Sequence, residues 1–239
     1  MTLKETLLKN GAWLLFGELS DKIFSYLLIV ILARMLGDVG LGEYSFVFAA
    51  VQTTFLLADV GVGDYIIREI SRYPERTREL FSNAVSLKFM LISAGFLATV
   101  VFVFFAPKSN YVLISMLLLS ARLALQNFGS LFEVLFQSRN QMQYVAGGQV
   151  IERITALVLG AYFLLNGNGL VVLFAGLFFS YVLRFIYQGI FFLKTEGFIS
   201  PSLNFKVMKE LVSGGIPLLL TGVFAFIYFR IDILMLSFM

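Results

Sequence analysis

Long apolar stretches dominate the chain and recur at intervals that suit membrane-spanning helices. A bilayer requires about 20 consecutive, predominantly apolar residues for each helical crossing. Windows of that length predict six spans, at 11–36, 43–66, 82–106, 111–136, 144–165 and 170–193. A seventh apolar stretch starts near residue 211. The pattern predicts an all-α integral membrane protein, with a six-helix transmembrane lobe over 1–194 and the start of a second lobe over 211–239.

A polar, turn-rich stretch separates these two parts. Residues 195–210 include Ser200, Pro201, Ser202 and Asn204, which favour a linker over a further span. The two glycines and the proline of 214–217 permit a bend before the seventh span. That span reaches Met239 without the polar flank that closes the others. We therefore expect a truncated second lobe.

Basic residues collect in alternate loops. Ten lie in the N-terminal segment and in the loops that follow the second, fourth and sixth spans: Lys4, Lys9, Arg68, Arg72, Arg76, Arg78, Arg139, Lys194, Lys206 and Lys209. The remaining loops contribute only Lys108. Because basic loops stay in the cytoplasm, the N-terminus and the 195–210 linker are predicted to be cytoplasmic, in a multi-pass protein of the cytoplasmic membrane.

Five polar residues follow one face of the fourth predicted span. Ser115, Arg122, Gln126, Glu133 and Gln137 fall within about 60° of one another at 100° per residue. A charge at mid-bilayer costs roughly 2.5–3.5 kcal/mol on insertion scales. The stripe therefore predicts a polar, water-filled or substrate-filled interior, with Arg122 and Gln126 lining it and Glu133 as a partner or gating residue.

Charged residues also cluster in the first predicted span. Glu18 and Lys22 have the i,i+4 spacing that pairs an acid with a base, and Asp21 lies beside them. One interpretation is a structural ion pair between helices. The other places Lys22 against an anionic ligand and gives Glu18 or Asp21 a coupling proton or cation.

The fifth and sixth spans add a second group of polar residues. Ser180, Arg184 and Gln188 repeat the i,i+4 spacing, and Glu152 and Arg153 lie in the fifth span. Arg184 either lines the interior or extends its charged group to the membrane surface.

Three candidates come from the second and seventh spans. Asp59 lies about two turns from the end of the second span, and Arg230 and Asp232 lie deep in the seventh. Arg230 is a candidate for the interior, and the two aspartates are candidates for ion coupling or gating. Lys88, by contrast, lies close enough to its cytoplasmic end that we expect its ammonium to reach the surface.

Composition excludes several classes of protein. Hydrophobic residues make up 59% of the chain and charged residues only 14%, and there is no Cys and no His. This removes disulfides, thiolate or imidazole metal sites and catalytic schemes that use either residue. The net charge of +3 comes largely from loops, so nucleic-acid binding is not expected. We expect neither a cofactor, nor a metal site, nor an enzyme.

Three pairs of segments carry a family resemblance. Residues 32–37 with 42–46 resemble the first helix hairpin of oligosaccharide flippases in the polysaccharide-biosynthesis family, which belongs to the multidrug/oligosaccharidyl-lipid/polysaccharide exporter superfamily. Residues 58–63 with 67–70 look like the end of that family's second helix, and 214–218 with 230–235 like its seventh. The resemblance covers the whole chain but only the front half of a typical member.

The resemblance implies two lobes that face each other across a central cavity. The substrate would be a polyprenyl-pyrophosphate-linked oligosaccharide, moved to the outer leaflet by alternating access for surface polysaccharide biosynthesis. A diphosphate requires cations in a medium of low dielectric constant, and Lys22, Arg122, Arg184 and Arg230 are the candidates. Membrane lipid, H⁺ or Na⁺, and polysaccharide-assembly proteins are the further partners to expect.

Two other functions are the alternatives, and the second of them is disfavoured. An ion-coupled multidrug exporter of the same architecture would use Asp21, Asp59 and Glu133 to bind a cation and a cationic drug. A membrane glycosyltransferase or polymerase would need an acidic metal-binding loop or a large outer loop, and the sequence shows neither. The sign of the charge in the cavity distinguishes the two exporters.

Overall fold

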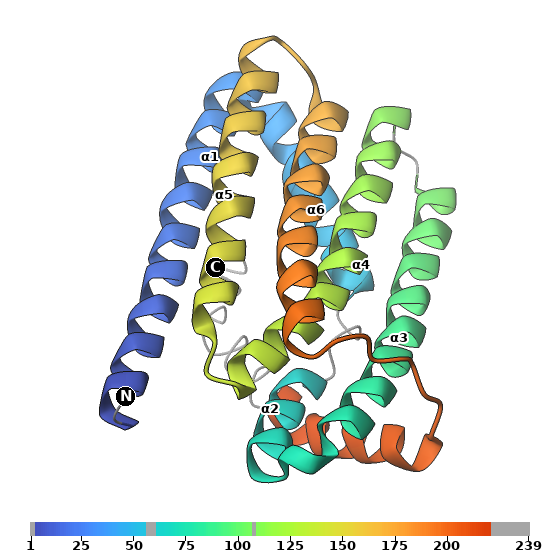
Figure 1. Cartoon of the computed structure of the whole chain (residues 1–239). Helices are drawn as coiled ribbons and strands as arrows, with labels where there is room; N and C mark the ends of the chain where they lie inside the picture. The colour runs from blue at the N-terminus through green and yellow to red at the C-terminus, as the bar shows by residue number, and fades with distance from the viewer. Residues whose placement is uncertain (1–2, 56–60, 107–108, 221–239) are drawn as a thin grey trace, which may run out of the picture.

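The computed structural model describes residues 3–55, 61–106 and 109–220, without the side chains of 3–10 and Leu14, and its regular secondary structure in these ranges is helical. Six α-helices come first in the chain: α1 (Leu3–Thr54), α2 (Val62–Arg72), α3 (Thr77–Phe105), α4 (Asn110–Ser138), α5 (Met142–Leu165) and α6 (Leu170–Thr195). A 3₁₀ turn, Pro74–Arg76, joins α2 to α3, and a further helix covers 205–220. Figure 1 shows the long helices standing side by side, with α2 across one end.

Among the described residues, five helices are long and apolar enough to cross a membrane. They are Gly11–Thr54, Pro74–Phe105, Asn110–Ser138, Met142–Leu165 and Leu170–Thr195. Four of these correspond to the predicted spans 82–106, 111–136, 144–165 and 170–193. The prediction of an all-helical, multi-pass membrane protein is confirmed.

The first of these helices is broken at Gly37. The glycine has φ 65° and ψ −171°, which lies outside the helical region and is reached without strain only by a residue that lacks Cβ. The chain turns back there, and Figure 1 shows the second arm of α1 descending behind α6. The ring of Tyr44 stacks on Phe174 of α6, at 5.5 Å between centroids, and fixes the start of that arm.

The prediction for the second span is wrong at its end. It continued the span to residue 66, whereas α1 ends at Thr54 and a separate short helix, α2, begins at Val62. Gly61 has φ 66°, and α2 buries Val62, Tyr65, Ile66 and Ile70 at helical spacing. Apolar residues on both sides of the break conceal it from a hydropathy window. Asp59 lies outside the described residues.

Two apolar clusters form the core. One joins α1, α4, α5 and α6 through residues such as Leu32, Met116 and Leu173. The other joins α2, α3, α4 and the helix 205–220 through residues such as Ile66 and Leu211. The second cluster lies at the end of the bundle that carries α2.

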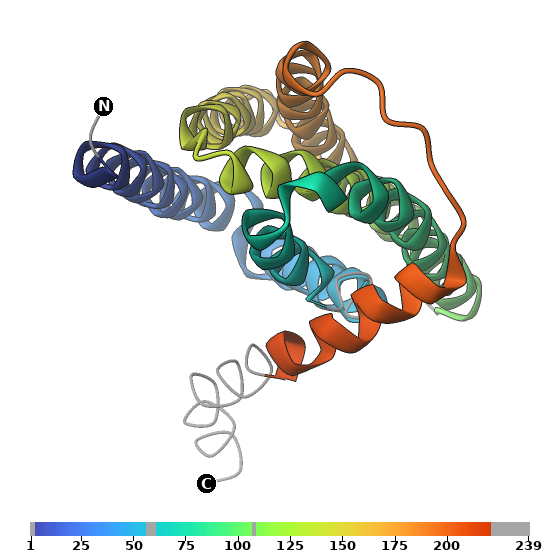
Figure 2. The same cartoon turned by 60° about the horizontal axis from the view of Figure 1, so that its bottom comes forward.

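The helix 205–220 lies across that end instead of standing in the bundle (Figure 2). Arg76 donates to both oxygens of Glu210, at 2.9 and 3.0 Å, and the Tyr65 hydroxyl donates to the same carboxylate at 3.0 Å. Gly61 touches the helix so closely that an added Cβ would lie 2.5 Å from the carbonyl oxygen of Gly215. The predicted linker 195–210 therefore consists of an irregular segment, 196–204, and the first turns of a docked helix.

Acid should weaken this docking. The hydrogen bonds from Arg76 hold the pKa of the Glu210 carboxyl below its ordinary value of 4.5. A carboxyl whose pKa is lowered in the folded state stabilises the docked helix at pH values above its ordinary pKa. This stabilisation is lost as the pH falls through the lowered pKa. We expect faster amide hydrogen exchange in 205–220 near pH 3.5 than at pH 7, after correction for the intrinsic rate. In Glu210→Gln this pH dependence should be smaller; an identical dependence in the variant and the parent would contradict the assignment.

Candidate functional site

Charged side chains from three helices meet inside the bundle. Arg122 and Glu133 come from α4, Glu152 from α5, and Arg184 and Gln188 from α6; we call these five residues the charge network. Each lies on a predominantly apolar helix, and the i,i+4 or near-i,i+11 spacing within a helix turns its members to one side. The network therefore lies where the polar faces of α4, α5 and α6 converge.

Glu152 is the centre of the network. One of its oxygens accepts from Arg122 at 2.6 Å and the other from Arg184 at 2.6 Å. Its side chain is only 2% exposed. A carboxylate that is shared by two guanidinium groups is compensated on both sides, which is the condition for holding a charge at that burial.

Arg184 extends the network to α4. Its second terminal nitrogen pairs with Glu133, and Gln188 donates to the same carboxylate oxygen at 3.2 Å. Two arginines and two glutamates leave the network with no formal charge. The arginine Nε of Arg184 and the amide oxygen of Gln188 are buried and have no hydrogen-bond partner in the described part of the chain.

An aromatic ring supports both arginines. The guanidinium carbons of Arg122 and Arg184 lie 5.6 and 5.4 Å from the centroid of the Tyr181 ring, within the range of a cation–π contact. Close packing of the helices depends on glycine here. A Cβ at Gly129 would lie 2.6 Å from the Tyr181 hydroxyl, and one at Gly148 would lie 2.9 Å from the Gln188 amide nitrogen.

A polar pocket lies on another side of α4. It has a volume of about 270 Å³ and is lined by Gln52, Gln126, Asn127 and Ser130 together with Phe55 and Leu123. Arg122 donates to Gln126 at 3.2 Å, so the pocket connects to the charge network through one hydrogen bond. Glycosidic and hydroxyl oxygens, or phosphate oxygens, would find amide and hydroxyl partners there.

Lys88 of α3 contacts Asn127, one of the residues that line this pocket. Its side chain is 1% exposed and its ammonium donates to Asn127 at 3.4 Å. The expectation that its charge reaches the membrane surface is wrong, because α3 directs it toward α4. Sequence spacing within one helix does not show which neighbour that helix will pack against.

The structure distributes the predicted site residues over several places. Arg122, Glu133 and Arg184 meet in the charge network, and Gln126 lines the polar pocket. Ser115, at the other end of the stripe, is buried and donates to the backbone of its own helix. The prediction selected the arginines but not Glu152, which compensates both of them; its depth in an apolar span was the available signal.

The first span behaves differently. Asp21 pairs with Arg153 of α5, beside the charge network. Glu18 and Lys22 are exposed on α1, and among the described side chains no ion pair joins them. Arg230 and Asp232 lie outside the described residues.

The family model described as "polysaccharide biosynthesis protein" matches residues 7–239. The chain belongs to this family. The match confirms the resemblance seen in residues 32–46, 58–70 and 214–235.

The fold of this family member also resembles that of a solved transporter. A MOP superfamily transporter from Pyrococcus furiosus, described as having a binding pocket of reverse polarity that suggests a different function, superposes with a TM-score of 0.68 at 16% sequence identity. The alignment covers 92% of this chain and 53% of that one, so the chain spans about half the length of the solved transporter. None of the curated proteins gives a significant match.

Loss of Arg184 should destabilise this family member strongly. Arg184→Gln leaves Glu133 without its guanidinium partner and Glu152 with one in place of two. Breaking a buried ion pair from one side costs about 3–5 kcal/mol. We expect a large loss of thermal stability in detergent for this variant, and a partial recovery when Glu133→Gln is added to it, because the second change removes the uncompensated carboxylate.

Arg153→Gln is the matched control. Its ion pair with Asp21 is 26% and 41% exposed, so its loss should cost at most about 1 kcal/mol. Equal losses for Arg184→Gln and Arg153→Gln would contradict the central position of Arg184.

Proposed function

We propose that this chain is the N-terminal lobe, with the start of the second, of a flippase that moves polyprenyl-pyrophosphate-linked oligosaccharide across the cytoplasmic membrane for surface polysaccharide biosynthesis. The family match supports a role in polysaccharide biosynthesis, and the similarity in fold to a MOP superfamily transporter supports a membrane exporter. The solved transporter is about twice as long, which agrees with two lobes and alternating access between them.

The proposed lobe has six crossings, with both arms of α1 entering the membrane. The stretch from Gly11 to Thr54 has 44 residues, and at 1.5 Å per residue this is about twice the thickness of the hydrocarbon core. The turn at Gly37 then lies at the end of the bundle opposite to α2. The end that carries α2, the start of α3 and the segment 196–204 also carries Arg72, Arg76 and Arg78, and we assign it to the cytoplasm.

The observation that carries the proposal is the charge network itself. Ionisable groups at membrane depth are expensive and usually serve a substrate or ion path. A pyrophosphate would compete with Glu133 and Glu152 for Arg122 and Arg184, since phosphate and carboxylate take the same bidentate geometry. The side chain of Arg122 is 11% exposed and that of Glu133 17%, so these two are the more accessible members.

Competition of this kind couples substrate to ion. An anion that takes an arginine leaves a carboxylate uncompensated, and that carboxylate then favours a proton or Na⁺. Glu133 is the first candidate, with Asp21 and Glu18 on α1 as alternatives; Asp59 and Asp232 complete the predicted set of coupling or gating residues. In the same scheme Gln126 and Lys22 contact the substrate from α4 and α1, and Arg230 would do so from the seventh span.

A multidrug exporter of the same superfamily is the second candidate. The network offers as many carboxylates as guanidinium groups, so a cationic drug would compete for Glu133 and Glu152 as an anion would for the arginines. Efflux of ethidium distinguishes the two, because a flippase for an anionic lipid confers none.

Topology can be measured directly, because the chain has no Cys. A single cysteine in Ser202→Cys should react with a membrane-impermeant maleimide only after the cytoplasmic side is opened. A cysteine in Asn168→Cys, in the loop between α5 and α6, should react in intact cells. The opposite pattern would invert the proposed orientation.

Transport should depend on the predicted cations. We expect Arg122→Gln and Lys22→Gln each to abolish display of the surface glycan in cells that rely on this protein for it, with normal membrane insertion. Lys209→Gln, which removes an exposed lysine far from the network, should leave display unchanged. Normal display in both test variants would falsify the cationic binding site, and ethidium resistance that requires Glu133 would favour the drug exporter.

A further inference from the structure

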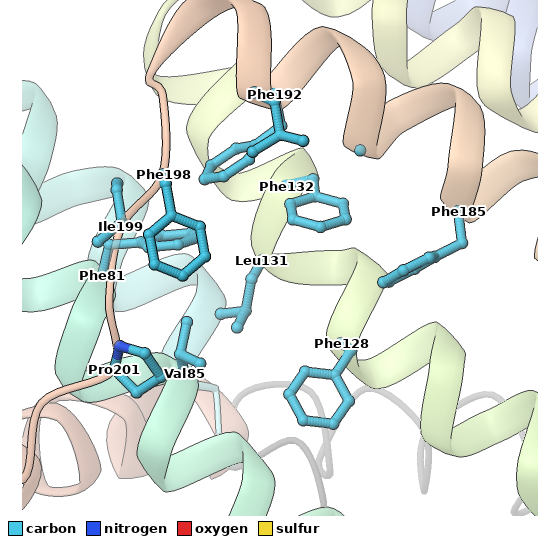
Figure 3. Close-up of a pocket in the computed structure, with 12 residues that line it drawn as sticks. Phe81, Val85, Phe128, Leu131, Phe132, Phe185, Phe192, Phe198, Ile199 and Pro201 are labelled. Atoms are coloured by element: carbon cyan, nitrogen blue, oxygen red, sulfur yellow. The ribbon is translucent and has the colours of Figure 1, made fainter.

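An apolar slot opens on the side of the bundle where the segment 196–204 passes α3, α4 and α6. Its volume is about 390 Å³, and six of its lining side chains are phenylalanines: Phe81, Phe128, Phe132, Phe185, Phe192 and Phe198. We call it the aromatic slot. In Figure 3 Phe198, Ile199 and Pro201 of the segment form one wall, opposite the rings of α4 and α6. Phe198 is 77% exposed, so the slot is open at its surface.

A second polar pocket, separate from the one lined by Gln126 and Asn127, adjoins the slot and has a volume of about 250 Å³. The polar pocket beside the slot is this second one. Arg78, Glu79, Ser82, Ser200 and Ser202 line it. Phe198 and Ile199 line both spaces, so one surface changes from aromatic to polar over two residues. The segment is held in this place by two hydrogen bonds, from Ser202 N to Ser82 O at 3.2 Å and from Asn204 N to the Asn83 side chain at 2.7 Å.

The polar pocket contains one cation, Arg78, that has no ion-pair partner among the described residues. Glu79 shares Arg76, at 3.3 Å, with Glu210, whereas the side chain of Arg78 is exposed. Arg78 also lies in the first turn of α3, where the positive end of the helix dipole adds to its attraction for an anion. Ser200 and Ser202 provide hydroxyl donors, whereas the Ser82 hydroxyl already donates to the Glu79 carbonyl at 3.1 Å.

The position of the two spaces fits a lipid. The polar pocket lies at the start of the span Pro74–Phe105, at the level of lipid head groups, and the slot continues along the apolar side of the same helix. The helix 205–220 leads the chain away from the slot, toward Gly61 and Tyr65. Among the described residues the slot therefore stays open, on the outer side of helices that we assign to the membrane.

We propose that the aromatic slot and the adjoining polar pocket bind one anionic glycerophospholipid of the membrane. An acyl chain lies among the phenylalanine rings, and the phosphate pairs with Arg78 and the neighbouring serine hydroxyls. Bound there, the lipid fastens the segment 196–204 to the lobe. This inference goes beyond the transported substrate and does not depend on it.

Lipid binding by the delipidated full chain, measured by native mass spectrometry, tests the proposal. The probes are palmitoyl-oleoyl phosphatidylglycerol and the phosphatidylcholine with the same chains. Arg78→Gln should weaken phosphatidylglycerol binding by about fivefold and phosphatidylcholine binding by less, because the choline cation already offsets the phosphate of the second lipid. Arg72→Gln, at the end of α2 and outside both spaces, is the matched control and should behave as the parent.

A second variant fills the slot without touching the charge. A Cβ at Gly189 would meet only the Phe132 ring, at 3.8 Å, so a side chain there starts in open space, and we expect the leucine of Gly189→Leu to occupy part of the slot. It should weaken binding of both lipids by about tenfold or more. Gly42→Leu, where a Cβ meets nothing within 4 Å, is its control.

Three results would overturn the proposal. The first is equal affinity of the parent for the two lipids, and the second is a loss in Arg78→Gln no larger than in Arg72→Gln. The third is displacement of phosphatidylglycerol by a smaller amount of undecaprenyl phosphate, which would make the occupant an isoprenoid. None of these results bears on glycan display in the Arg122 and Lys22 variants, so the two proposals fail separately.

Discussion

The interior of the bundle depends on two ion pairs, which Glu152 makes with Arg122 and with Arg184. They join α4, α5 and α6 through a carboxylate that is 2% exposed, and each guanidinium group loses its compensation if that carboxylate is removed. Apolar packing alone would let these helices rotate or slide at little cost, because lipid is as apolar as their side chains. The network fixes their mutual rotation.

Hydropathy predicted most of this fold because each bilayer crossing has a minimum length. The spans that became α3 to α6 follow from apolar content alone. The break between Thr54 and Val62 did not, since it depends on the backbone conformation at Gly61 and on the partners of an amphipathic turn. For the same reason the docked helix 205–220 was predicted as a linker followed by a span.

The candidate site was predicted in part, and the missing part has a physical cause. Periodicity shows which residues of one helix share a face, so Arg122 and Glu133 were found together. It does not show which helices meet, so it places Glu152 in the fifth span without its arginine partners, and it sends the Lys88 ammonium to the membrane surface instead of toward α4. The arginines of the sequence predict a cationic interior, and the structure pairs them with Glu133 and Glu152 in a network without net charge.

The sharing of one carboxylate also restricts how this interior can diverge among relatives. A substitution at Arg122, Glu152 or Arg184 alone leaves an unpaired charge inside the bundle. Evolutionary changes that keep the protein stable therefore require substitutions at two of these positions together. Lineages that reverse the polarity of such an interior must therefore cross a barrier of stability before any gain in selectivity can be selected. The three residues should be inherited, or lost, as one unit.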